Sequence, residues 1–61
     1  MKKRRKFSGH WFELDSVWTG PNNAKYVYAR VDKIRNKQKR LCRLMEVSPY
    51  HWQIWIGPYR K

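Results

Sequence analysis

The side chains able to perform acid–base or metal chemistry are few and scattered. They are His10, Glu13, Asp15, Cys42 and His51. Two histidines and one cysteine far apart do not match the ligand spacing of a zinc site. The sequence contains no glycine-rich phosphate loop, nucleophile elbow or paired catalytic carboxylates. We therefore expect no enzymatic activity and no metal or other cofactor. A small ribonuclease toxin remains as a third hypothesis for the function, because a histidine base beside Arg and Lys suffices for RNA cleavage.

Positive charge is the strongest signal in the chain. Fifteen Lys and Arg residues stand against four Asp and Glu, which gives a net charge of +11 in 61 residues. The charge is concentrated in residues 2–6, the run KKRRK, and in residues 25–43, which carry eight basic side chains and one Asp. Two concentrated basic blocks predict an anionic partner, and a nucleic-acid backbone is the most general one.

The candidate contact residues fall into three groups. The first basic block is expected to neutralise phosphates, and residues 33–43 of the second to cluster at the tip of a hairpin. At the start of the second block, Tyr26, Tyr28 and Arg30 alternate, so a strand would place them on one face, where rings can stack on bases. The full candidate nucleic-acid-binding set is Lys2, Lys3, Arg4, Arg5, Lys6, Tyr26, Tyr28, Arg30, Lys33, Arg35, Lys37, Lys39, Arg40 and Arg43.

These residues require elements to position them, and alternation of period two predicts several strands. Residues 10–18 alternate and would place Phe12, Leu14 and Trp18 on one face. The dense turn signal TGPNNAK follows, and residues 26–34 alternate again. Residues 50–57 form a last alternating run.

Residues 35–47 are compatible with two structures. In one, residues 35–38 form a turn and residues 40–47 return as a strand antiparallel to 26–34. In the other, residues 33–47 form a helix that stops before Ser48-Pro49, although its first turn would then be basic at the positive end of the helix dipole. The expected fold is mainly β, a small four-stranded antiparallel meander or half-barrel, and the alternative is an α+β fold of order ββαβ.

Two units are expected along the chain. Residues 1–8 read as a flexible, disordered basic tail and residues 9–61 as a single small domain. The single cysteine, Cys42, cannot form an intrachain disulfide and is expected to be a buried small hydrophobe. The basic start lacks the apolar stretch of an export signal, and no transmembrane segment is visible. A cytoplasmic location is therefore expected.

The leading functional hypothesis is a small basic nucleic-acid-binding protein, of phage or bacterial origin and regulatory in role. Its ligand would be DNA or RNA. The alternative is a protein-interaction module that binds and inhibits an acidic host factor. A membrane partner is not expected, because the strands lack a long amphipathic helix. A homodimer formed through an exposed strand edge is compatible with so small a sheet.

Overall fold

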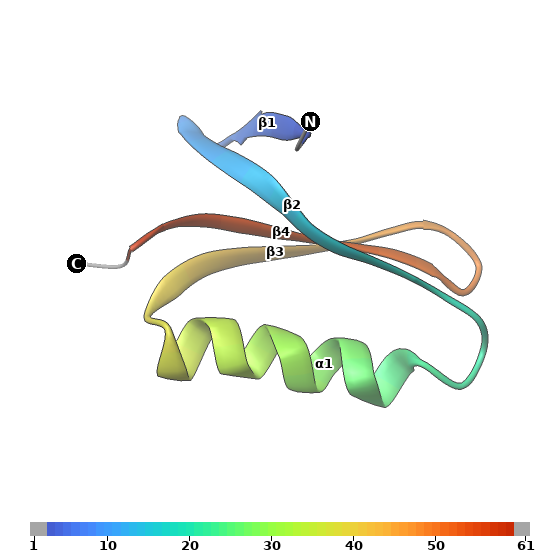
Figure 1. Ribbon diagram of the computed structural model, residues 1–61. Helices are drawn as coiled ribbons and strands as arrows, with labels where there is room; N and C mark the ends of the chain where they lie inside the picture. The colour runs from blue at the N-terminus through green and yellow to red at the C-terminus, as the bar shows by residue number, and fades with distance from the viewer. Residues whose placement is uncertain (1–2, 60–61) are drawn as a thin grey trace.

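Four antiparallel strands form one curled sheet in the computed structural model, which describes residues 3–59 (Figure 1). The strand order is β1-β2-β4-β3, so the chain leaves β2, crosses to the far edge and returns through the middle. The strands are β1 (Arg4–Phe7), β2 (His10–Thr19), β3 (Arg40–Ser48) and β4 (His51–Tyr59). The prediction of a small, mainly β fold with a four-stranded antiparallel sheet is confirmed in its half-barrel form, whereas the strand order is not that of a meander.

The segment between β2 and β3 is helical, so the predicted strand over 26–34 is wrong. Helix α1 spans Ala24–Asp32. Ala24, Val27, Val31 and Ile34 recur at the spacing of one helix face, and this apolar stripe lies against the sheet. The alternation of small and aromatic residues over 26–31 concealed that stripe. Packing of a complete apolar face outweighed the strand propensity of Val and Tyr.

The helix continues into a π-helical segment, η1 (Lys33–Lys37), where the Gln38 amide donates to the Lys33 carbonyl over 3.1 Å. The predicted turn over 35–38 is therefore wrong. The alternative helix over 33–47 is also wrong beyond Lys37, because Lys39 adopts a positive φ of 56° and β3 begins at Arg40. The predicted strand over 40–47 is confirmed, but its partner is β4 and not residues 26–34.

The core lies between the helical segment and one face of β3 and β4. Val27 and Ile34 on the helix are fully buried, as is Ile54 at the centre of β4. Cys42 is buried among them, which confirms that expectation. The whole buried cluster is Val27, Val31, Ile34, Cys42, Trp52, Ile54 and Ile56.

A bulge at Asp15 changes which face of β2 is buried. Leu14 pairs with Trp55 of β4 and Ser16 pairs with Ile54, so one extra residue stands between them. Because Ile54 and Trp55 point to opposite faces, Leu14 and Ser16 do so too. Phe12 and Leu14 therefore share the face away from the helix, and Trp18 packs on the helix side. The expectation that these three side chains share one face is wrong.

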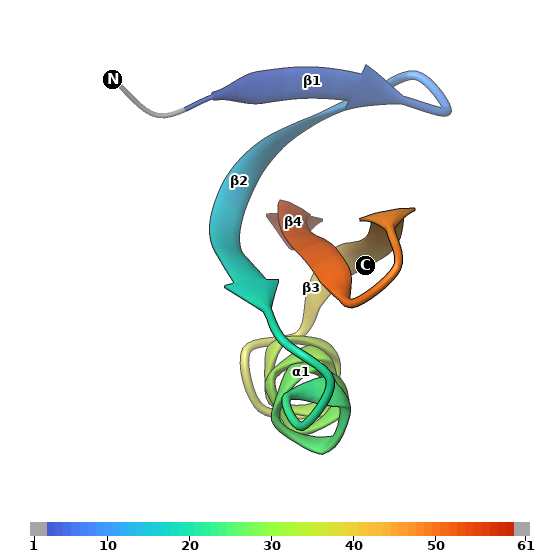
Figure 2. The same ribbon diagram turned by 90° about the vertical axis from the view of Figure 1, so that its right-hand side faces the viewer.

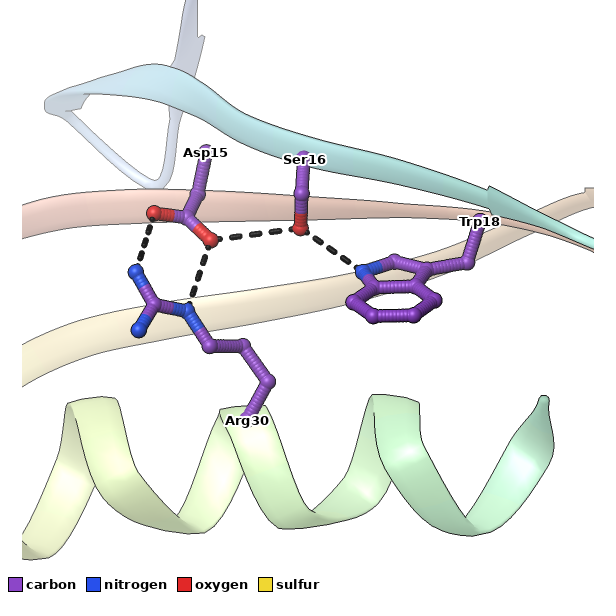
Figure 3. A network of polar contacts seen from close by, with 4 residues as sticks. All are labelled: Asp15, Ser16, Trp18 and Arg30. Atoms are coloured by element: carbon purple, nitrogen blue, oxygen red, sulfur yellow. Dashed lines mark hydrogen bonds and ion pairs between the residues drawn. The ribbon is translucent and has the colours of Figure 1, made fainter.

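The bulge also aims the Asp15 carboxylate at the helix (Figure 3). Arg30 Nη2 donates to Asp15 Oδ1 over 2.9 Å, and Arg30 Nε donates to Oδ2 over 3.0 Å. Ser16 Oγ donates to the same carboxylate, and Trp18 Nε1 donates to Ser16 Oγ over 2.9 Å. This network fixes the helix to β2.

The expected tail is partly a strand. Arg4–Phe7 form β1, which pairs with the start of β2 through a turn at Ser8 and Gly9, both with positive φ. Residues 4–7 therefore belong to the sheet and not to a separate flexible unit, whereas Met1 and Lys2 lie outside the described residues. In Figure 2, β2 bends so strongly that β1 lies on the opposite side of β3 and β4 from the helix.

Candidate nucleic-acid interface

A groove of about 350 Å³ lies where the β1–β2 turn, the start of β3 and the end of the helical segment meet. Three arginines line it, one from η1 and two from β3, and no acidic side chain is among the described residues around it. Its polarity is therefore suited to an anion. The lining residues are Phe7, Ser8, His10, Phe12, Arg35, Arg40, Leu41, Cys42 and Arg43.

Phe7 is the point at which the two basic blocks meet. Its ring packs edge-on against Phe12, with 5.3 Å between centroids, and against Trp55 at 5.6 Å. The guanidinium carbon of Arg5, from the first block, lies 5.2 Å from the Phe7 centroid. That of Arg43, from the second block, lies 4.8 Å from it. Curling of the sheet thus joins cations that are far apart in sequence around one ring.

Arg40 is held at the same end of the sheet by two contacts. Its Nε donates to the Gly57 carbonyl over 2.7 Å, and its guanidinium lies 5.1 Å from the Tyr59 centroid. The hydrogen bond uses Nε, so the terminal nitrogens remain as donors. Gly57 is needed here because a Cβ would come within 2.8 Å of two ring atoms of Phe12. Close packing of Phe12 on bare backbone therefore shapes the wall of the groove.

The other face of the β1–β2 hairpin carries a second basic and aromatic group. Trp11 is 57% exposed, and Arg4 and Lys6 lie 5.7 and 6.0 Å from its ring centroid. Because successive side chains of a strand point to opposite faces, Arg4 and Lys6 lie on the other face of β1 from Arg5 and Phe7. Lys3 is exposed just before β1, and its carbonyl accepts a hydrogen bond from the Leu14 amide. The first basic block is thereby divided between two faces.

The predicted aromatic sheet face does not exist. Tyr26 and Tyr28 are exposed on α1, and residues two apart on a helix point about 200° away from each other. Arg30 lies on the side of the helix that faces β2 and is engaged by Asp15. This hydrogen bond raises the pKa of the Arg30 guanidinium. Arg30 is therefore a structural residue, and the sequence-based grouping of these three side chains is wrong.

The second basic block is also divided, because its first part is helical. Arg35, Arg40 and Arg43 line the groove, whereas Lys33 and Lys37 line a different hollow on the exposed side of the helix. Lys39 is exposed at the junction with β3. The predicted cluster of all these cations at one hairpin tip is wrong.

The histidines occupy two separate places. His10 lines the groove, and His51 Nδ1 lies 2.8 Å from Ser48 Oγ beside the β3–β4 turn. Within residues 3–59, no group of three or more His, Cys, Asp or Glu side chains is arranged to hold a metal ion.

Sequence reasoning missed Phe7 and Phe12 as part of the site. Phe7 directly follows the basic run, for which the sequence predicts a flexible tail. The Ser8-Gly9 pair was the available signal, because two residues that tolerate positive φ between extended segments form a tight hairpin turn. Such a turn brings the residue before it back against the next strand.

Within the described part of the chain, no helix has the length and apolar character needed to cross a membrane. Comparison of the whole chain with protein-family models, curated proteins and solved structures found no match.

Proposed function

We propose that this protein binds nucleic acid, and that the groove between the β1–β2 turn and the start of β3 is its contact site. The observation that supports this proposal is the meeting of the two basic blocks around Phe7, with Arg5 and Arg43 both over its ring. Like charges held this close repel each other. An anionic ligand relieves that repulsion, and a phosphate backbone supplies several anions in a row.

Arginine is the suitable cation for such a site. Its planar guanidinium stacks on rings and at the same time donates paired hydrogen bonds to phosphate oxygens. The guanidinium carbons of Arg40 and Arg43 already lie over the rings of Tyr59 and Phe7, within cation–π distance. The proposal is one of binding without catalysis. It places the protein in the cytoplasm, where nucleic acid is accessible and the free thiol of Cys42 stays reduced.

The test is a binding titration with short oligonucleotides at rising salt. Contacts from Arg5, Arg35, Arg40 and Arg43 predict a log–log salt slope of roughly −3 to −4. Arg43→Gln is expected to weaken binding and to reduce the magnitude of the slope by about 1. Lys33→Gln is the matched control, since it removes the same charge from the exposed side of the helix and is expected to change the slope little.

Two outcomes would contradict the proposal. One is weak binding that does not depend on salt. The other is an equal loss of affinity in Arg43→Gln and Lys33→Gln, which would indicate a diffuse attraction by the net charge and no defined site.

A further inference from the structure

The groove contains more apolar surface than phosphate contacts alone require. Phe7 and Phe12 line it beside Leu41, whereas neutralising a backbone needs only cations. Phe12 is buried, but Phe7 is only half-buried although it makes two ring contacts. An aromatic surface bordered by arginines is typical of sites where a base stacks while its phosphate is held.

The volume of the groove limits the size of the ligand that it can hold. A volume of about 350 Å³ lies at the lower end of small-molecule sites. That suits one nucleotide. A duplex keeps the faces of its bases inside the stack, so only an unpaired base can offer a face to a protein side chain.

Arg43 provides the surface on which such a base would stack. It is exposed, and its guanidinium lies 4.8 Å from the Phe7 centroid. A guanidinium stacked on a ring through one face keeps its other face for a second planar group. Arg40 and Arg35 line the same groove and supply the positive charge for the adjoining phosphate.

From these observations we infer that the groove takes one unpaired nucleotide of a single strand, with its base stacked on the Arg43–Phe7 pair and its phosphate held by Arg35 and Arg40. This inference rests on the proposed function and narrows it. DNA and RNA single strands share the required chemistry, and the experiment separates them.

The first measurement uses the unaltered protein. Affinities are compared for a single-stranded DNA, the matching RNA and the DNA duplex of the same sequence at one salt concentration. The inference predicts that at least one of the single strands binds about fivefold or more tightly than the duplex, the scale of stacking one base. A duplex bound as tightly as both single strands, or more tightly, would overturn it.

The second measurement removes the ring without changing charge. Phe7→Leu is expected to weaken single-strand binding about fivefold and to leave duplex binding unchanged. Trp11→Leu is the matched control, because it removes an exposed ring on the other face of the same hairpin. An equal or larger loss in Trp11→Leu would assign the stacking to Trp11 and overturn the inference. A circular dichroism spectrum of each variant checks that it is folded.

The two proposals fail in different ways. If no oligonucleotide binds in a salt-dependent manner, the proposed function itself is wrong. If the strands bind with the expected salt slope but without preference over the duplex, the nucleic-acid function stands and only the single-nucleotide inference is wrong.

Discussion

The guanidinium of Arg43 on β3 lies over the ring of Phe7 on β1, 4.8 Å from its centroid, although these strands stand at opposite edges of the sheet. The contact exists because β2 bends and carries β1 over the face that the helix leaves uncovered (Figure 2). Residues of β1 and β3, the two edge strands, therefore line the same groove. Arginines of both basic blocks thereby lie over one ring.

Arg5 and Arg4 offer a matched pair on neighbouring positions of β1. Arg5 lies over the ring of Phe7, which lines the groove, and Arg4 lies over Trp11 on the other face. Arg5→Gln is expected to weaken oligonucleotide binding about tenfold or more, the scale of one charge-assisted hydrogen bond. Arg4→Gln removes the same charge and is expected to have a clearly smaller effect in the same titration. Equal effects would argue against a groove-specific contact.

Gly57→Ala is expected to destabilise the fold by about 1–3 kcal/mol, the usual cost of overpacking. The added Cβ would come within 2.8 Å of two Phe12 ring atoms and 3.1 Å of Leu41 Cβ. Urea unfolding measures the loss. Phe12→Leu removes the opposing ring, so the double variant is expected to lose less than the two single losses together. Strict additivity would show that this contact is not the cause.

Asp15→Asn tests the attachment of the helix to β2. The side chain of Asp15 is 13% exposed and that of Arg30 is 34% exposed, so solvent screens the pair only in part. Losing the carboxylate leaves a half-buried guanidinium without its anion, and we expect a destabilisation of about 1–2 kcal/mol in urea unfolding. Asp32→Asn, on the exposed side of the helix, is the control and should change stability little. A comparable loss in both would contradict this role for the pair.

The burial of Cys42 predicts that the free energy of unfolding depends on pH. Burial raises the pKa of its thiol, so the unfolded chain loses this proton at a lower pH than the folded chain. The free energy of unfolding is then expected to fall as pH rises from the unfolded pKa towards the folded one, from about pH 8 upward. Urea midpoints at several pH values measure it. Cys42→Ala lacks this thiol, so an equally steep fall in that variant would contradict the explanation.

Three of the four strands could be predicted from the sequence, β2 and β4 because they alternate, whereas β1 was expected to belong to a tail. Residues 10–18 and 40–47 lie within β2 and β3, and residues 51–57 of the predicted run 50–57 lie within β4. Residues 26–34 could not be assigned by alternation, because Val27 and Val31 fit both a period of two and a helical stripe. Ile34 distinguishes the two structures, because it lies on the same face as Val27 and Val31 only when the segment is helical.

The basic character of the candidate site could be predicted from the sequence, but its geometry could not. The basic residues predict an anionic partner. Which of them lie close together depends on the bend of β2 and on the helical start of the second block, and both arise from tertiary packing. Arg30 illustrates the difference, since a bulge one residue long aims Asp15 at it and engages it in an ion pair within the fold.

The central claim is that the groove around Phe7 is where nucleic acid binds, and NMR of the labelled protein tests it most directly. Titration with a short single strand is predicted to shift the Phe7 ring protons and the Nε–Hε signals of Arg5, Arg40 and Arg43 in a saturable way. Signals of Lys33 and Lys37 should move little. Saturable shifts concentrated on the exposed side of the helix and absent from the groove would contradict the account.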